Sequence, residues 1–136
     1  MLFAGDTGFS QHIIDIADRI GPMTVSLLPI GAYAPRVFMQ SMHMDPEDAA
    51  VSHLELSSQH SIGMHWGTFK LTQEPLSEPP LYLAAMLNRH QIPAEQFIVS
   101  KLGATHVYEA VAGRVINRHP DYHRDVPDVL TIKGFD

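Results

Sequence analysis

The sequence predicts an α/β fold in which short strands alternate with helices along one domain. Three observations support this: apolar runs of strand length end at turn residues, several segments carry helix start signals, and the two kinds of segment alternate. A chain of 136 residues is typical of a single domain, and 45 % hydrophobic with 18 % charged residues is ordinary for a chain that buries a core.

Strand, helix and strand signals follow one another at the start of the chain. Residues 1–4 form a short apolar run that stops at a glycine, which predicts a buried strand. Ser10 is expected to cap a helix whose isoleucines recur at helical spacing and which ends before a Gly-Pro pair. The aliphatic and β-branched run over residues 24–28 predicts the second strand, and residues 29–36 are expected to form a loop.

A strong helix start lies in the string Asp45-Pro46-Glu47-Asp48. Asp45 suits the N-cap, Pro46 suits the first helical position, and the acidic residues lie at the positive end of the helix dipole. We expect this helix to run to about Ser57. The remaining predicted elements are a strand over residues 61–64, a helix over residues 81–89 and short strands over residues 97–100 and 106–109.

Composition excludes several classes of function. The formal net charge is −6, with nine Lys and Arg against fifteen Asp and Glu, which argues against nucleic acid as a partner. The absence of Cys excludes disulfides and thiolate metal ligands and agrees with the expected cytoplasmic location. No apolar run approaches the roughly 18–20 residues of a membrane span, so no transmembrane segment is expected.

Two side chains suited to catalysis follow predicted strands. Asp6 comes after the first strand and His65 after the third. Since sites in open α/β sheets form beyond the carboxyl ends of the strands, we expect these two side chains to meet. Carboxylate and imidazole together suit hydrolytic metals such as zinc. From the residues alone, Asp6 can equally form an Asx turn, and His65 can be a hydrogen-bonded structural residue.

Other polar residues have simpler explanations. His43 precedes the Asp45 cap and can be an exposed loop residue, while Tyr33 and Arg36 can serve packing and a surface ion pair. The segment over residues 119–125 contains two histidines, but its proline disfavours a regular helix. An independent metal-binding protein that uses this segment is a separate hypothesis.

Several strings, in shared order and spacing, resemble one family. The similarity is to the C-terminal half of the N-acylphosphatidylethanolamine-hydrolysing phospholipase D-like hydrolases, a branch of the metallo-β-lactamase-fold superfamily. It covers about residues 2–109, so we expect a hydrolase domain over residues 1–110 and a tail without resemblance over residues 111–136. The strings are Phe3-Ala4-Gly5-Asp6-Thr7-Gly8, Leu28-Pro29-Ile30-Gly31-Ala32-Tyr33 with Pro35-Arg36, Phe38-Met39, His43-Met44-Asp45-Pro46-Glu47-Asp48-Ala49, His65-Trp66-Gly67-Thr68-Phe69 and Glu78-Pro79-Pro80.

The resemblance implies a fold and a metal site. The fold would be the C-terminal half of an αββα sandwich, with two zinc ions between the halves of a complete site. Asp6 would bridge both metals, His65 would bind one of them, and His43 and Tyr33 would contact the substrate. Asp6 and His43 would be the catalytic residues in phospholipase D-like hydrolysis of a phosphodiester or phospholipid by metal-activated water.

One departure from the family pattern bears on activity. The family's His-x-His-x-Asp-His signature occurs nowhere in these 136 residues, so the N-terminal half of the site is expected to be absent. The resemblance therefore predicts activity only with a complementary N-terminal half, supplied by another chain or within a homo-oligomer. The alternative is a non-catalytic truncated homologue that acts as a binding or self-assembly module through its exposed sheet.

Overall fold

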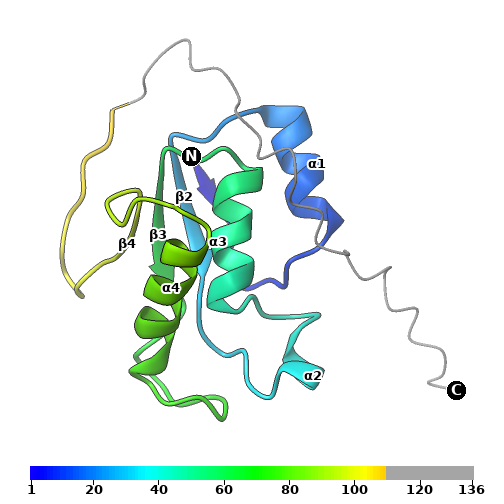
Figure 1. Ribbon diagram of the computed structural model, residues 1–136, viewed down its shortest axis with the longest axis vertical. Coiled ribbons are helices and arrows are strands. Elements are labelled where there is room, and N and C mark those ends of the chain that lie inside the picture. Colours follow the sequence, from blue (N-terminus) through cyan, green and yellow to red (C-terminus); the bar gives the residue numbers. More distant parts are fainter. Residues whose placement is uncertain (110–136) are drawn as a thin grey trace, which may run out of the picture.

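A four-stranded parallel sheet with the order β1-β2-β3-β4 forms the centre of the structure (Figure 1). The computed structural model describes residues 1–109. The predicted α/β class, with alternating strands and helices, is confirmed. The strands are β1 (Leu2–Phe3), β2 (Val25–Pro29), β3 (His60–Met64) and β4 (Phe97–Val99), and the helices are α1 (Gln11–Ile20), α2 (Arg36–Met39), α3 (Pro46–Glu55) and α4 (Glu78–Arg89).

The helices serve as crossovers between parallel neighbours. The chain passes through α1 between β1 and β2, through α2 and α3 between β2 and β3, and through α4 between β3 and β4. In the register, Leu27 of β2 lies opposite Phe3 of β1 and opposite Ile62 of β3. All four strands therefore end at the same edge of the sheet, where the loops after β1, β2 and β3 come together.

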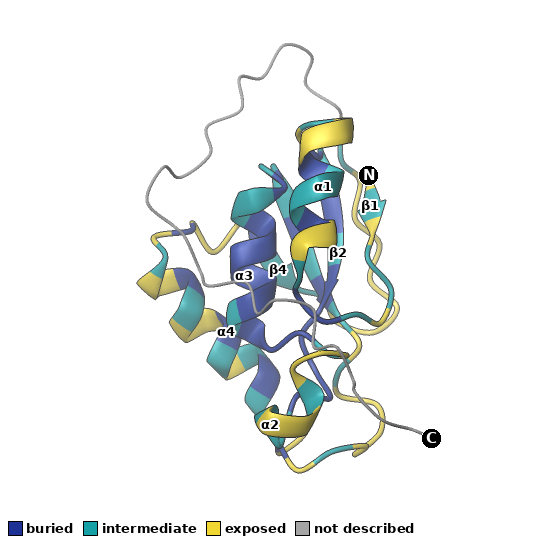
Figure 2. Ribbon diagram, turned by 90° about the vertical axis from the view of Figure 1, so that its right-hand side faces the viewer, coloured by how far each residue is buried: buried dark blue, intermediate teal, exposed yellow. Residues whose placement is uncertain are grey.

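The hydrophobic core lies between the sheet and the helices. Helix α3 packs against β2 and β3, with α1 on one side and α4 on the other (Figures 1 and 2). Leu28 of β2 and Ala49 and Ala50 of α3 are fully buried there. Phe97 of β4 closes the same core at the sheet edge. Burial of these apolar surfaces is the main term that stabilises the layered arrangement.

The opposite face of the sheet is apolar and only partly covered by the described residues. Phe3, Leu27, Ile62 and Ile98 lie in one row across the four strands, and neighbouring rows point to the other side. The last three are half-buried, whereas Phe3 is 65 % exposed. The expectation of a buried first strand is therefore wrong, because within the described residues β1 lies at the edge of the sheet and pairs with β2 alone.

The helix starts agree with expectation at α3 and depart from it elsewhere. Asp45 and Asp48 form a capping box in which each side chain accepts from the other's backbone N–H. Ser10 stands at the N-cap position of α1, but its Oγ pairs with Nδ1 of His12 at 2.6 Å and makes no capping hydrogen bond to the helix backbone. Helix α4 begins at Glu78, earlier than expected, because prolines are tolerated in the first turn.

Two further expectations are corrected. The expected loop is found between Pro29, the last residue of β2, and Arg36, the first residue of α2, but the short helix α2 itself was not expected. Residues 106–109 form no strand; instead the Tyr108 ring lies 4.7 Å from the His60 ring and 6.3 Å from the His106 ring. The predicted tail over residues 111–136, with its histidine pair, lies outside the described residues. No helix among residues 1–109 is long and apolar enough to span a membrane.

The packing of α4 gives a direct test of the core. Leu83 is 1 % exposed, whereas Leu81 in the same helix is 71 % exposed. We expect Leu83→Ala to lower the free energy of unfolding by about 2–5 kcal/mol, because it removes buried methyl groups and leaves a cavity. Leu81→Ala is the matched control and should change that free energy by less than about 0.5 kcal/mol. Urea unfolding of both variants measures the difference, and equal effects would contradict this packing.

Candidate metal centre

Three potential metal ligands converge at the carboxyl edge of the sheet. Asp6 follows β1, His65 follows β3, and His43 lies between α2 and α3. Asp6 Oδ1 lies 2.7 Å from His43 Nδ1, and Asp6 Oδ2 lies 3.5 Å from His65 Nε2. The three ligand atoms all lie within 4.8 Å of one another. The expected meeting of Asp6 and His65 is thus observed, and His43, which the family resemblance places in the site, lies beside Asp6.

The ligand atoms are arranged as they would be around a shared cation. His43 Nδ1 is buried and makes no hydrogen bond within the described residues, although Asp6 Oδ1 lies 2.7 Å away. With Zn–N bonds of about 2.0–2.1 Å, two ligand atoms of one tetrahedral zinc ion lie roughly 3.3 Å apart. The separations of 2.7 and 3.5 Å involve different oxygens of Asp6, and one ligand atom from each residue lies within 4.8 Å of the others. One carboxylate and two imidazoles therefore suit a zinc-type ion in donor chemistry and lie close enough together to share one.

The Asp6 turn packs directly against the segment that carries His43. Gly5, two residues after the end of β1, has a φ of +69°, a backbone conformation that favours glycine. The backbone N–H of Met44 donates to the carbonyl of Thr7 at 2.9 Å. A Cβ on Gly8 would lie only 2.7 Å from the carbonyl oxygen of Ser41. The small residue at position 8 thus allows the two loops to touch and holds Asp6 beside His43.

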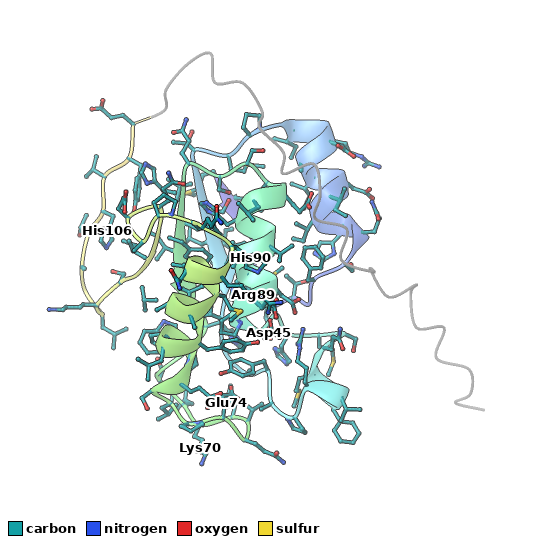
Figure 3. The ribbon with its side chains drawn as sticks, in the orientation of Figure 1. Asp45, Lys70, Glu74, Arg89, His90 and His106 are labelled. Atoms are coloured by element: carbon teal, nitrogen blue, oxygen red, sulfur yellow. The ribbon has the colours of Figure 1, made fainter. Side chains whose placement is uncertain are left out.

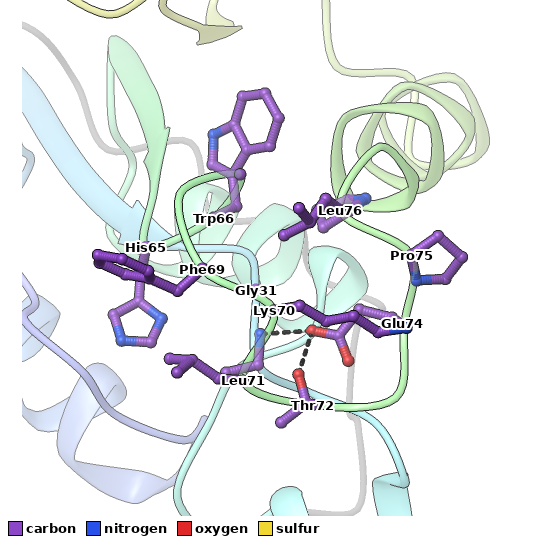
Figure 4. A pocket seen from close by; sticks show the side chains of 13 residues that line it. Gly31, His65, Trp66, Phe69, Lys70, Leu71, Thr72, Glu74, Pro75 and Leu76 are labelled. Atoms are coloured by element: carbon purple, nitrogen blue, oxygen red, sulfur yellow. Dashed lines mark hydrogen bonds between the residues drawn. The ribbon is translucent and has the colours of Figure 1, made fainter.

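His65 is fixed by a second close approach of backbone to backbone. It has a φ of +60°, which turns the chain sharply at the end of β3. The N–H of Ile30 donates to the carbonyl of Met64 at 3.0 Å, which continues the pairing of β2 and β3 beyond the strands. A Cβ on Gly31 would lie 2.3 Å from the His65 carbonyl oxygen. Only glycine at position 31 leaves room for this turn, which lies beside it in Figure 4.

Glu74 anchors the loop that follows His65 (Figures 3 and 4). Its carboxylate accepts the N–H of Ala32 at 2.7 Å, the N–H of Ala34 at 3.0 Å and the hydroxyl of Thr72 at 2.6 Å. Burial alone would raise the pKa of Glu74, but these hydrogen bonds outweigh it and hold the pKa below its usual range. Sequence reasoning missed Glu74, because nothing in its proline-containing loop indicates which backbone groups it would meet.

A small hollow lies beside His65 (Figure 4). Its walls come from the β2–α2 loop, from the turn at His65 and from the loop before α4. Phe69 and Leu71 line it and are 74 % and 70 % exposed, respectively. Apolar side chains therefore flank the candidate centre, and Lys70 lies between these two.

Tyr33 is found in a packing role. It is buried, its hydroxyl donates to Glu78 Oε1 at 2.6 Å, and its ring meets Tyr82 edge-on at 5.9 Å. Burial raises the pKa of the Tyr33 phenol, and the hydrogen bond to Glu78 raises it further. Its hydroxyl is thus bonded to Glu78 rather than to any of the three candidate ligands. Contact between Tyr33 and a substrate stays a prediction.

Comparisons with known proteins agree with this arrangement. Residues 1–66 match the model of the beta-lactamase superfamily domain. The chain is 36 % identical over 104 residues to N-acyl-phosphatidylethanolamine-hydrolyzing phospholipase D 1 of Caenorhabditis elegans, covering 74 % of this chain and 29 % of that protein. The parallel α/β sheet of the structure is consistent with part of a metallo-β-lactamase-type fold. The resemblance inferred from the sequence strings is therefore confirmed.

Two further relatives of this chain are also named as hydrolases. The mitochondrial N-acyl-phosphatidylethanolamine-hydrolyzing phospholipase D of Saccharomyces cerevisiae is 33 % identical over 81 residues, covering 58 % of this chain and 17 % of that protein. A UPF0173 metal-dependent hydrolase of Listeria welshimeri is 33 % identical over 84 residues, covering 62 % of this chain and 32 % of that protein. The chain thus spans less than a third of the length of these relatives. Their names support a hydrolase function and a metal cofactor.

The close approach at Gly31 generates a stability prediction. We expect Gly31→Ala to lower the free energy of unfolding by about 3 kcal/mol, because its Cβ would meet a backbone oxygen that cannot rotate away. Gly63→Ala is the matched control: its Cβ would meet the Cδ1 atom of Ile30, the movable end of a side chain, at 2.8 Å. Its cost should be about 1 kcal/mol. Thermal and urea unfolding compare the two, and an equally small cost at position 31 would contradict the described turn.

The Glu74 anchor generates a pH prediction. Because its pKa is lower in the folded chain than its ordinary value of 4.5, the ionised carboxylate stabilises the fold above that pH. This stabilisation is lost as the pH falls through the lower, folded pKa. Glu74→Gln should therefore reduce the free energy of unfolding at about pH 7, and the reduction should shrink below about pH 4. Urea unfolding across this range measures it. Glu95→Gln, at an exposed glutamate, is the control and should have no effect at neutral pH.

Proposed function

We propose that Asp6, His43 and His65 hold a metal ion, with zinc as the first choice, in the active site of a metal-dependent phosphodiester hydrolase. The observation that carries this proposal is the convergence of three ligand atoms within 4.8 Å, one of them a buried imidazole nitrogen without a hydrogen-bond partner. Catalytic zinc sites commonly have three protein ligands and keep a further position open. Asp6 is 46 % exposed, which leaves an approach to that position from solvent.

The three side chains would have distinct tasks in such a site. Asp6 presents one oxygen to each histidine, so its carboxylate would hold the metal from between the two rings, and His65 would add a ligand through Nε2. His43 directs Nδ1 towards Asp6, so in a neutral ligating imidazole the proton resides on Nε2. That N–H can donate a hydrogen bond to a substrate phosphate oxygen. When bound, the metal supplies Lewis-acid polarisation of the phosphoryl group and lowers the pKa of a coordinated water.

A phospholipid is the substrate class that the surroundings favour. Two relatives are named as phospholipases D that hydrolyse N-acyl-phosphatidylethanolamine. In this chain the exposed Phe69 and Leu71 stand at the hollow beside His65, where acyl chains would find apolar surface. Tyr33, in the adjacent loop, would contribute to substrate contact only if its bond to Glu78 opened.

The active form would combine this chain with further ligands from a complementary half or from a second copy. The apolar row of Phe3, Leu27, Ile62 and Ile98 supports such an association, because a contiguous apolar face on a sheet favours a covering partner. The same row is the observation that favours the alternative function, a non-catalytic module that binds or self-assembles through its sheet.

Zinc titration of the full chain tests the proposed centre. Isothermal titration calorimetry should show uptake that weakens by at least about tenfold in Asp6→Asn and His65→Ala, since even changes outside the ligand shell commonly cost about 10- to 100-fold. The controls repeat the same chemical changes at exposed positions, in Glu95→Gln and His106→Ala, and should bind as the unsubstituted chain does. Absence of zinc uptake together with a dimer in light scattering would instead favour the assembly module.

A further inference from the structure

Arg36 forms a polar cluster around the backbone of the His43 segment. It lies at the first position of α2, and its Nη1 donates to the carbonyl oxygen of His43 at 2.7 Å. Its Nε lies 3.0 Å from Asp45 Oδ2, and its Nη2 donates to Asp48 Oδ2. Both aspartates are buried in the first turn of α3. A single guanidinium therefore links the candidate ligand to a helix that is anchored in the core (Figure 3 labels Asp45 at this point).

Hydrophobic packing does little to hold the segment that carries His43. Helix α2 has no buried residue. Val37 is 81 % exposed, Phe38 is 72 % exposed and Met42 is 58 % exposed. The apolar core therefore does not determine how residues 36–42 lie, and the position of the segment depends on its polar contacts.

The backbone at His43 is held at three consecutive groups. Its N–H donates to Met39 at 2.8 Å, its carbonyl accepts from Arg36, and the next N–H, of Met44, donates to Thr7. Fixing both peptide planes around a residue fixes the direction of its Cα–Cβ bond and so limits where the side chain can point. Of these contacts, the one from Arg36 is made by a side chain and can be removed by substitution.

Arg36 is not needed to cap the N-terminus of α3. The capping box is complete through Asp45 and Asp48 themselves, because each carboxylate accepts the other's backbone N–H. The arginine adds charge compensation for two buried carboxylates and the link to the His43 carbonyl. A planar guanidinium suits this task, since it presents several N–H donors in fixed directions, whereas a lysine ammonium is a single flexible point.

We propose that Arg36 is a positioning residue, which fixes the backbone of His43 so that the Nδ1 atom faces Asp6. The effect on metal binding rests on the proposed function, but the effect on the His43 ring does not. Loss of the guanidinium should leave the core intact while the imidazole becomes free to leave the cluster.

The test uses the full chain with Arg36→Lys. This substitution keeps the positive charge and removes the planar guanidinium with its fixed N–H donors. Two-dimensional ¹H–¹⁵N spectra of the histidine rings without metal should show a change in the His43 ring signals and none in those of His53, which is buried elsewhere in the core. Zinc affinity, measured by calorimetry, should fall by about 10- to 100-fold, as it commonly does when a residue that orients a ligand is changed. Circular dichroism should show unchanged helix content.

Arg89→Lys is the matched control. Arg89, at the C-terminal end of α4 (Figure 3), also pairs with an acidic residue of α3, with Nη1 3.1 Å from Glu47 Oε1. The His43 carbonyl accepts from Arg36 instead. Arg89→Lys should alter neither the His43 signals nor the zinc affinity. Should Arg36→Lys behave in both measurements like Arg89→Lys, the positioning role is overturned. If the unsubstituted chain takes up no zinc, the proposed metal centre fails, and the His43 signals still decide the role of Arg36.

A second variant covers the case in which Arg36→Lys does not fold. The double substitution Arg36→Met, Asp48→Asn removes both partners of one pair, so that no unpaired charge stays buried at position 48. Its His43 ring signals should again differ from those of the unsubstituted chain and of the single variant Asp48→Asn. Identical signals in all three proteins would refute the proposal.

Discussion

Parallel pairing of β2 with both of its neighbours is the constraint on which the candidate site depends. Because β1 and β3 run in the same direction on either side of β2, their carboxyl ends lie at one edge of the sheet. Asp6 and His65, distant in sequence, therefore come within 3.5 Å of each other. An antiparallel β3 would carry His65 to the opposite edge, and no loop rearrangement could restore the contact. Strand direction therefore decides whether these two side chains can meet, whatever their exact conformations.

Polar contacts and small residues, rather than the hydrophobic core, position the residues at this edge. The loops touch through backbone at Gly8 and Gly31, where any larger side chain would collide with a carbonyl oxygen. Arg36 and Glu74 then tie the outer loops to the body of the chain through ion pairs and backbone hydrogen bonds. The core supplies stability and the rigid strand ends, while these anchors determine which way the ligands face.

The proposed assembly would explain both the sheet face that the described residues cover only in part and the small number of metal ligands that they bring together. Three protein ligands satisfy one catalytic ion, whereas a two-metal centre needs more donors than the described residues bring together. The apolar row that includes Phe3 and Ile62 would be buried by whatever supplies those donors. Stability and metal binding would then be coupled, since the same association would cover the sheet and complete the site.

The sequence by itself determined the alternation of strands and helices, the capped start of α3 at Asp45 and the pairing of Asp6 with His65. These features depend on local periodicity, on capping chemistry and on the rule that strand ends share an edge. Only the tertiary structure decided that Phe3 is exposed, that His43 completes the cluster, and that Arg36 and Glu74 act as anchors. Each of these depends on partners many residues away, and no local pattern encodes which distant backbone group a charged side chain will meet.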